Sequence, residues 1–448
     1  MGGLERGEGP VTFGAMQPKA LPGFRDFYPE ELALRAHIFE TWRRVASRYG
    51  FEEYDGPPLE PLELYTAKSG DEIVGQLYEF TDKGDRRVAL RPEMTPTLAR
   101  MVAARANGLK KPIRWFSIPQ LFRYERQQRG RLREHFQLNC DLIGESSPLA
   151  DAEIVGLTID LMRAFGLGSK DVRVRLSDRR ALTALLKGKG VPDAGLLSAF
   201  QFIDKIERLR PEDIEQLRRE PQPYAPASVD QLVAVSKIRG MDAVESALAG
   251  VPGGDEALAP MQQTVAALEA MGFGEFLDVD FTIVRGIAYY TGTVFELFDA
   301  GKTLRAICGG GRYDNLTEAV GGVALPAVGF GMGDVVLGEL LKDRDLVPPH
   351  RASIDVFLAA IGEEDQPHLL RLAHQLRDAG LRVEFSLGAG AVGKQLKLAD
   401  ARHARLAVVI GPDDRARGEV QVKNLAGKTQ EAVAVGALVG WLKEKLLD

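Results

Sequence analysis

Residues 113–144 read IRWFSIPQLFRYERQQRGRLREHFQLNCDLIG. Apolar and polar side chains alternate in the second half of this stretch. The apolar set is Phe136, Leu138, Cys140 and Leu142, and the polar set is His135, Gln137, Asn139 and Asp141. In a β-strand, this alternation places the apolar set in a core and the polar set on the opposite face. A solvated face is one interpretation, but Asn and Asp are poor strand formers, so the polar row favours a lined cavity.

The densest positive cluster of the chain lies just before that strand. Five arginines fall within residues 123–133, in a polar loop between two expected strands, and Glu125 is the single acid between residues 110 and 133. Guanidinium groups match phosphate oxygens with paired hydrogen bonds, so this hairpin is typical of phosphate binding. A solvated loop is the alternative, and the neighbouring polar row favours the binding interpretation.

Sequence periodicity predicts the elements on either side of this stretch. We expect a helix over 30–49, a strand over 87–90, and a helix from Pro96 to about 106 with Thr95 as its N-cap. Residues 168–274 carry helical patterns and predict a helical insertion. Further strands are expected at 281–284, 289–298 and 309–314, and a helix near 333–341.

The end of the chain alternates strands with helices after a Pro-containing segment, residues 343–352, which we expect to be a linker. The expected strands are 354–361, 381–387 and 406–410, and the expected helices are 366–379, 394–401 and 435–447. This β-α-β-α-β order predicts a parallel-type sheet covered by helices.

The composition is that of a globular protein, with 448 residues, a net charge of −6, 45% hydrophobic and 27% charged residues. An apolar run of about 20 residues, which a membrane span needs, does not occur. The two cysteines, Cys140 and Cys308, are too few for a disulfide framework or a four-cysteine zinc site. We therefore expect a cytoplasmic protein without a structural metal. Residues 1–18 lack a signal-peptide core and are expected to be disordered, with Met16 as a possible start.

Two glycine-containing segments follow the helical region. They read RGIAYYTG at 285–292 and GGGRYD at 309–314. Three successive glycines allow a ligand or another backbone to approach closely, although a bend in a sheet is equally compatible with them. Neither segment matches a P-loop or a dinucleotide-binding fingerprint.

Several motifs, in the correct order, resemble the histidyl-tRNA synthetase family of class II aminoacyl-tRNA synthetases. Residues 123–137 resemble motif 2 of the class, and 50–60, with Pro57, resemble motif 1. Residues 90–95, which read LRPEMT, and residues 285–292 resemble histidine-specific signatures of the family, and residues 310–314 also fit the family. The tail resembles the family's anticodon-binding domain, so the resemblance covers about residues 17–448.

The resemblance implies an α+β fold. The expected catalytic domain, residues 19–342, is built on a mainly antiparallel class II sheet with a helical insertion at about 180–270. The linker at 343–352 and an anticodon-binding α/β domain at 353–448 would follow. The resemblance also implies a homodimer formed through the motif 1 region near Pro57, without membrane association.

The activity implied by the resemblance is ATP-dependent ligation of L-histidine to tRNA(His) through a histidyl-adenylate, with Mg²⁺ on the ATP phosphates. No side chain stands out as a metal ligand. The catalytic residues would be Arg123 and Arg285, which hold the α-phosphate from two sides, because a charge-rich transition state needs preorganised cations. The implied ATP-binding residues are Arg123, Glu125, Arg131 and Arg312.

The implied histidine-binding residues divide into two groups. Glu93, Thr95 and Gln137 would hold the α-amino group, and Asp141 and Tyr290, beside Tyr289, would contact the imidazole nitrogens. A site that hydrogen-bonds both ring nitrogens would reject apolar analogues strongly. The implied contacts to the tRNA acceptor stem are Arg126, Gln128, Arg129 and Arg133.

Two positions depart from the family pattern. Val336 occupies the place of the motif 3 arginine that packs on adenine, and Ala288 stands where an aspartate is common. A cation–π contact of about 1–2 kcal/mol would be missing at Val336. This favours either apolar packing of the adenine or weakened ATP use.

Three alternatives therefore stay open. The first is the non-catalytic, histidyl-tRNA synthetase-like regulatory subunit of ATP phosphoribosyltransferase. That subunit lacks the tail domain, whereas residues 353–448 supply one here. The second is a prolyl, threonyl or glycyl synthetase of the same subclass, which the signature at 285–292 disfavours. A simple nucleic-acid-binding module is the third.

Overall fold

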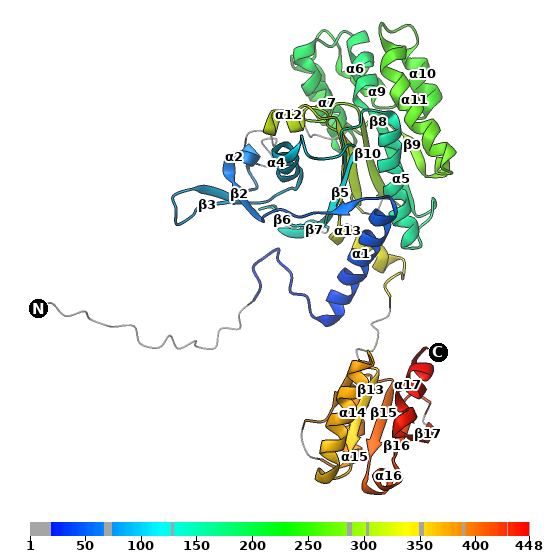
Figure 1. The fold of residues 1–448 in the computed structure, drawn as a ribbon. Helices are drawn as coiled ribbons and strands as arrows, with labels where there is room; N and C mark the ends of the chain where they lie inside the picture. Colours follow the sequence, from blue (N-terminus) through cyan, green and yellow to red (C-terminus); the bar gives the residue numbers. More distant parts are fainter. Residues whose placement is uncertain are drawn as a thin grey trace, which may run out of the picture. The chain divides into compact units, whose positions relative to one another are not determined.

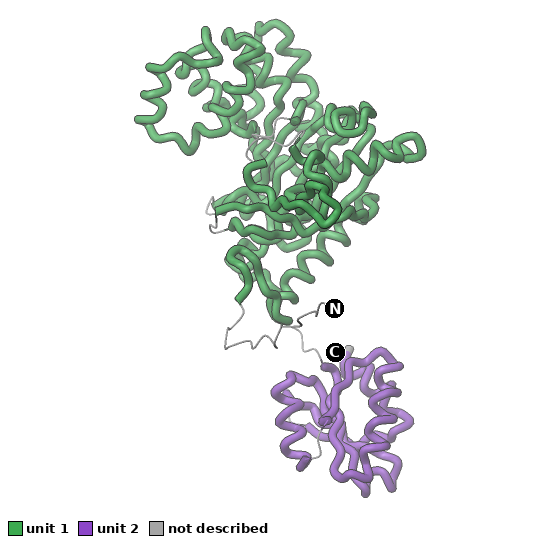
Figure 2. The backbone as a smooth tube through the Cα atoms, turned by 90° about the vertical axis from the view of Figure 1, so that its left-hand side faces the viewer, with its two compact units in different colours: residues 1–348 green, residues 349–448 purple. Residues whose placement is uncertain are grey.

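The alternating stretch forms β7 (Glu134–Ile143), an inner strand of a sheet in the first of two units, residues 1–348 (Figures 1 and 2). Among the described residues this sheet has nine strands in the order β1-β5-β7-β12-β11-β10-β8-β9, with β6 also paired to β7. Only the β1–β5 and β8–β9 pairs are parallel, which confirms the predicted mainly antiparallel sheet. The other strands are β1 (Glu52–Glu53), β5 (Ile113–Ser117), β6 (Gln120–Phe122), β8 (Val172–Asp178), β9 (Leu277–Val279), β10 (Thr293–Asp299), β11 (Cys308–Arg312) and β12 (Ala327–Gly333).

The computed structural model describes residues 19–66, 74–126, 130–284, 289–301, 304–348, 354–387, 390–427 and 429–447. The segment expected to be disordered, residues 1–18, lies outside the described residues.

One face of β7 supplies the core, as the alternation predicted. Leu138, Cys140 and Leu142 are at most 1% exposed and belong to a cluster that includes side chains of α1 (Pro29–Arg48) and α5 (Pro148–Ala164). α5 begins where the Ser147 hydroxyl accepts a hydrogen bond from the Leu149 amide at 3.2 Å, directly before Pro148. Burying this side of β7 fixes its register, so the polar set must face the opposite side.

A smaller sheet and short helices flank the polar side of β7. The sheet has the order β2-β4-β3, with β2 (Leu59–Pro61), β3 (Tyr78–Thr81) and β4 (Arg87–Leu90), the last as predicted. The helix after β4 starts one residue earlier than expected, because Thr95 is its first residue and Met94 its N-cap. The helices here are α2 (Leu62–Thr66), α4 (Thr95–Arg105) and α12 (Leu316–Gly321), whereas α13 (Asp334–Asp343) packs with α1 on the core side.

Helices occupy the insertion expected at about 180–270 and gather at one end of the unit in Figure 1. The start of the wider stretch expected to be helical, 168–274, instead forms strand β8. They are α6 (Arg179–Gly188), α7 (Leu196–Lys205), α8 (Pro211–Arg219), α9 (Val229–Val235), α10 (Met241–Leu248) and α11 (Gly254–Ala270), with the 3-10 turns Asp193–Gly195, Ile206–Arg208 and Gly274–Phe276. The strand predicted at 281–284 is wrong. Asp280 accepts hydrogen bonds from the Thr282 amide and hydroxyl at 2.9 and 2.8 Å, which folds the chain into a turn.

The second unit, residues 349–448, has its own core around a five-stranded sheet of order β14-β13-β15-β16-β17 in the described residues. The β14–β13–β15 part is parallel, as the alternation predicted, but β16 and β17 add an antiparallel hairpin that we did not predict. Its elements are β13 (Val356–Ala360), α14 (Gln366–Asp378), β14 (Val383–Phe385), α15 (Val392–Ala401), β15 (Leu406–Ile410), α16 (Pro412–Arg417), β16 (Glu419–Asn424), β17 (Thr429–Ala434) and α17 (Leu438–Leu447), with 3-10 turns at Glu363–Asp365 and Val435–Ala437.

The boundary between the units falls after Pro348, later than the start of the expected linker at 343. Leu346 packs against the core of the first unit, and Arg344 Nη2 donates to Asp299 Oδ1 at 2.8 Å. These contacts hold the beginning of the predicted linker on the first unit. Across the described residues, no helix combines the length and the apolar character that crossing a membrane would require.

Candidate active site

The polar face of β7 lines a pocket, which we call the polar pocket. It is lined by Glu93, Thr95, Arg123, Gln137, Asn139, Asp141, Tyr289, Tyr290, Gly309, Tyr313, Gly329, Phe330 and Gly331. Seven residues that the sequence predicted for the catalytic or histidine-binding sites meet here, although they come from four separate stretches of chain. The polar row therefore lines a cavity, as the poor strand propensity of Asn and Asp suggested.

Glycines on β12 make the room for these side chains. Gly329 pairs with Asp141 across the sheet, and a Cβ atom added to Gly329 would overlap the Asp141 carboxylate. A Cβ atom added to Gly331 would lie 2.7 Å from the Gln137 side-chain amide carbon. Gly329 and Gly331 are thus required by the close approach of β7 side chains to the neighbouring backbone.

A buried carboxyl–phenol pair lies at the back of the polar pocket. The Tyr313 hydroxyl donates a hydrogen bond to Asp141, which is 4% exposed. Burial raises the pKa of Asp141 to about 7, against the hydrogen bond from Tyr313, which lowers it. The Tyr289 ring centroid lies 5.8 Å from that of Tyr313 and 5.3 Å from that of Tyr290. An acceptor enclosed by aromatic rings suits a flat ligand ring that carries an N–H group.

Arg91 holds the loop that carries Glu93 and leads to Thr95 at the start of α4. Its Nη1 donates to Asp55 Oδ1 at 2.8 Å and to the Gly56 carbonyl at 2.7 Å, and its Nε donates to the Gln120 carbonyl at 3.0 Å. Arg123 Nε adds a hydrogen bond to the Pro92 carbonyl at 2.8 Å. Glu93 is 6% exposed at the end of this loop. A buried carboxylate in a pocket of this kind suits an ammonium group.

A second cavity shares Arg123 with the polar pocket, and we call it the arginine pocket. It is lined by Arg123, Glu125, Gly130, Arg131, Leu132, His135, Arg305, Ala306, Gly333, Val335 and Val336. Arg131 forms an ion pair with Glu125. Burial, together with the charges of Arg123 and Arg25, lowers the pKa of His135 to about 3, so this imidazole is neutral. Because Arg123 lines both cavities, a ligand can extend from one into the other beside its guanidinium.

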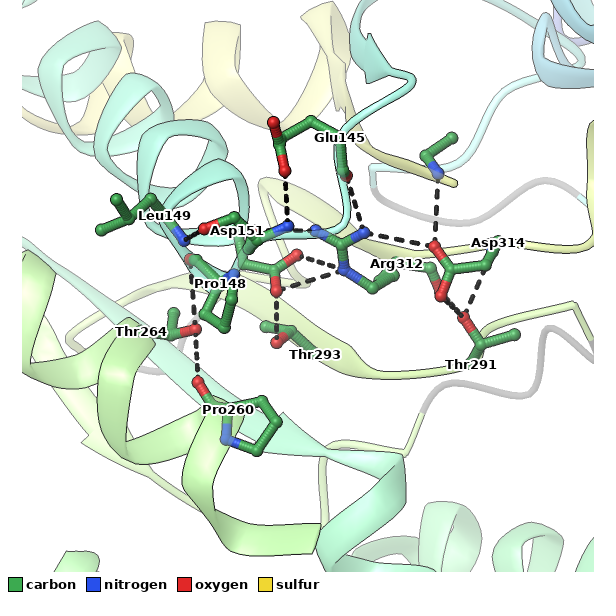
Figure 3. A network of polar contacts seen from close by, with 12 residues as sticks. Glu145, Pro148, Leu149, Asp151, Pro260, Thr264, Thr291, Thr293, Arg312 and Asp314 are labelled. Carbon is green, nitrogen blue, oxygen red and sulfur yellow. Dashed lines mark hydrogen bonds and ion pairs between the residues drawn. The ribbon is translucent and has the colours of Figure 1, made fainter. Parts of the chain in front are cut away.

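Arg312 lines neither pocket, which corrects the expectation that it binds ATP. Figure 3 shows it in a network of polar contacts with Asp151 and Asp314. It is 1% exposed, and its Nε donates to Asp151 Oδ1 at 2.9 Å. Its Nη1 and Nη2 donate to the carbonyls of Glu145 and Ser147 at 3.0 and 3.2 Å. Alternate residues of a strand face opposite sides, so Gly309 faces the pocket while Arg312 points toward α5. Arg312 therefore has a structural role.

The other predicted positions divide between exposed and undescribed residues. Arg126 is exposed, and the Arg133 guanidinium lies 4.0 Å from the Tyr124 ring centroid, outside both pockets. Arg285, Gln128 and Arg129, and also Ala288, lie outside the described residues. Pro57, which we expect in a dimer interface, is exposed.

Two pocket residues were missed from the sequence. Tyr313 belongs to the second glycine-containing segment, and its spacing of two and four residues from Gly311 and Gly309 is the signal that places all three on one strand face. Arg305 carried no recognisable signal in the sequence. It reaches the arginine pocket only because β11 begins beside the end of β12.

Comparison with known proteins agrees with this geometry. Residues 23–333 match the family model "Histidyl-tRNA synthetase", and residues 355–445 match "Anticodon binding domain". The chain is 44% identical over 418 residues to a histidine–tRNA ligase of Opitutus terrae, covering 93% of this chain and 95% of that protein. It is 39% identical over 418 residues to the chloroplastic/mitochondrial histidine–tRNA ligase of Arabidopsis thaliana, covering 93% and 85%. The protein belongs to the histidyl-tRNA synthetase family.

The fold agrees with a solved structure of the same family. The crystal structure of histidyl-tRNA synthetase from Nostoc sp. PCC 7120 superposes with a TM-score of 0.80 at 27% sequence identity, covering 96% of this chain and 100% of that one.

Proposed function

We propose that the protein joins L-histidine to tRNA(His) in two steps. Histidine and ATP first give histidyl-adenylate and diphosphate, and the histidyl group then passes to the 3′ end of the tRNA with release of AMP. The observation that carries the proposal is the polar pocket. It holds the buried carboxyl–phenol pair of Asp141 and Tyr313 and the buried carboxylate of Glu93, and it shares Arg123 with the arginine pocket.

Histidine fits the polar pocket in one orientation. Asp141 accepts a hydrogen bond from one imidazole nitrogen, while the hydroxyl of Tyr313 or Tyr290 contacts the other. Glu93, with Thr95 and Gln137, holds the α-ammonium group at the opposite side of the cavity. Charge and hydrogen-bond complementarity at both ends select histidine over apolar amino acids of similar size.

The arginine pocket takes the nucleotide. Arg123, which lines both cavities, holds the α-phosphate where the histidine carboxylate attacks it. Arg285 supplies a second cation from the other side, as the family resemblance implies. Charge develops on the phosphate oxygens during the attack, so cations fixed in advance lower the barrier.

Mg²⁺ enters bound to the ATP phosphates. Among the described residues, no three His, Cys, Asp or Glu side chains are grouped so that they could hold a metal ion. Glu125 lines the arginine pocket in an ion pair with Arg131 and is the carboxylate there that could contact a hydrated ion. The ion would neutralise phosphate charge when bound.

The tRNA contacts two regions. Arg126, Gln128, Arg129 and Arg133 meet the acceptor stem, and residues 355–445 bind the anticodon. A homodimer formed near Pro57 is part of the same proposal. The regulatory-subunit alternative is less favoured, because the relatives named histidine–tRNA ligase match almost the full chain, including the tail.

The deciding experiment is amino-acid-dependent exchange of diphosphate into ATP, run with each of the twenty standard amino acids. Exchange with histidine alone is expected. Absence of exchange with histidine would reject ligase activity and favour the regulatory subunit, and exchange with proline, threonine or glycine would favour one of the other synthetases.

A further inference from the structure

Two buried hydroxyl groups beside the polar pocket have no hydrogen-bond partner in the part of the chain that the structure describes. They belong to Tyr54, which follows β1, and to Ser117, the last residue of β5. Ser117 is 0% exposed, and neither residue lines the pocket itself. A buried hydroxyl without a partner has lost its hydrogen bonds to water, which destabilises the fold, so a function for this pair is expected.

Strand pairing brings both hydroxyls to the side of the sheet on which Asp141 lies. Trp115 pairs with Asp141 across β5 and β7, so these two side chains point to the same face. Ser117, two residues after Trp115, shares that face. The Tyr54 ring centroid lies 5.5 Å from that of Trp115, and Tyr54 packs against the same cluster as Tyr313. The two hydroxyls therefore lie next to the buried carboxyl–phenol pair.

The backbone on both sides of the Tyr54 side chain is held in place. The Tyr54 amide donates to the Phe116 carbonyl at 2.8 Å, and the next residue, Asp55, accepts from Arg91 Nη1 at 2.8 Å. Arg91 also holds the loop that carries Glu93. One short segment is thus tied to both ends of the polar pocket, although the sequence predicted for this stretch, 50–60, only a place in a dimer interface.

The charges around Tyr54 keep it a hydrogen-bond donor. Burial and the negative charge of Asp141 raise the pKa of Tyr54, and the nearby Ser117 hydroxyl opposes this rise. The phenol therefore keeps its proton. An ionised carboxylate accepts several hydrogen bonds, and Tyr313 supplies one to Asp141. A second donor at the same carboxylate would be satisfied and would fix its orientation.

We propose that Tyr54 is a positioning residue for histidine recognition, whose hydroxyl donates a second hydrogen bond to Asp141 when this carboxylate binds the imidazole. The Ser117 hydroxyl donates to the Tyr54 oxygen and so turns the phenol proton toward Asp141. The inference rests on the proposed function, because it deepens the account of the same histidine site. A group that contacts a ligand keeps its geometry only when neighbouring hydrogen bonds hold it.

The test compares Tyr54→Phe with the unaltered protein, because this change removes only the hydroxyl oxygen. In diphosphate exchange the KM for histidine is expected to rise about tenfold, while the KM for ATP stays within about twofold. The melting temperature should not fall, because no described hydrogen bond of the unliganded fold is lost. Ser117→Ala should raise the KM for histidine by about threefold, since it removes only the group that orients the phenol.

Tyr49→Phe is the matched control. The Tyr49 hydroxyl donates to Asp160 Oδ2 at 2.8 Å, between α1 and α5, and Tyr49 packs against the main core cluster. Removing this hydroxyl should lower the melting temperature by about 2 °C and leave both KM values unchanged. The two variants lose the same atom, so opposite effects on stability and on histidine affinity separate a structural hydroxyl from a positioning one.

A KM for histidine within about twofold of the unaltered value in Tyr54→Phe would overturn the proposal. A lower melting temperature with an equal rise of both KM values would also overturn it, because the hydroxyl would then be part of the fold. Calorimetric titration with histidine in the absence of ATP measures the same contact without catalysis. If the unaltered protein binds histidine but shows no exchange, the proposed function fails, and the titration still decides the role of Tyr54.

Discussion

At the scale of single residues, Asp141, which we propose to contact histidine, also affects the stability of the fold. Its carboxyl is buried and its pKa is raised from 3.8 to about 7. Between these two values the folded protein keeps a proton that the unfolded chain has lost, so the unfolding free energy falls as the pH rises. Above pH 7 the buried carboxylate is charged, and burying this charge lowers the unfolding free energy by its full amount.

Asp141→Asn should therefore stabilise the protein at pH 8 and not at pH 4. The expected gain at pH 8 is on the order of 2–4 kcal/mol, because the neutral amide avoids burying a charge. Urea unfolding at several pH values measures it, and the same variant should lose histidine-dependent exchange. Equal stability differences at pH 4 and pH 8 would show that Asp141 does not titrate in this range.

Arg312 gives a second prediction at this scale. Arg312→Met leaves Asp151 buried without its cation and should lower the unfolding free energy by about 3–5 kcal/mol. Replacing both, as Arg312→Met with Asp151→Leu, should recover most of that loss, because no buried charge is left unpaired. If the single variant had unchanged stability and a raised KM for ATP, Arg312 would bind ATP and would not have the structural role described above.

At the scale of the element, β12 contributes space rather than functional groups. Gly329→Ala would place a methyl group against the Asp141 carboxylate. The added Cβ atom would also lie 2.8 Å from the Cys140 carbonyl oxygen, so the carboxylate must turn away from the ligand and the backbone of β7 must shift as well. The KM for histidine should rise at least tenfold, on the order of 1.4 kcal/mol, with a much smaller change in the KM for ATP.

Gly338→Ala on α13 is the control for this variant. There an added Cβ atom meets Leu34 and Ile38 at ordinary contact distances of 3.8 and 3.9 Å. Alanine also favours the helix, so the control should fold at least as stably as the unaltered protein. A Gly329→Ala protein with an unaltered KM for histidine would mean that Asp141 does not contact the substrate.

At the scale of the whole molecule, the two units have separate cores. A protein ending at Pro348 should therefore keep histidine-dependent exchange, because every described residue of both pockets lies before that point. It should lose most of its efficiency in charging tRNA, and substitutions in the anticodon should no longer affect it. Steady-state charging of transcripts with native and altered anticodons measures both effects. If the shortened protein charged tRNA as efficiently as the full chain does, residues 355–445 would not be the part that binds the anticodon.

The sequence by itself determined the part of the site that depends on local periodicity. The alternation from His135 to Leu142 predicted both a core face and a polar cavity face, because side-chain direction in a strand repeats every second residue. The order of the motifs was likewise readable along the chain. The Asn and Asp residues in that strand indicated a cavity, because these residue types are poor strand formers and a strand that only faces solvent does not need them.

Tertiary structure decided everything that depended on where a strand begins or which distant segments meet. Arg312 was expected at the ATP site, but the register of β11 turns its side chain toward Asp151. Tyr313 and Asp141 form a pair although they are 172 residues apart, and Arg305 joins Arg123 and Arg131 only through the pairing of β11 with β12. Register and strand pairing are set by the packing of the whole core, which no local sequence pattern specifies.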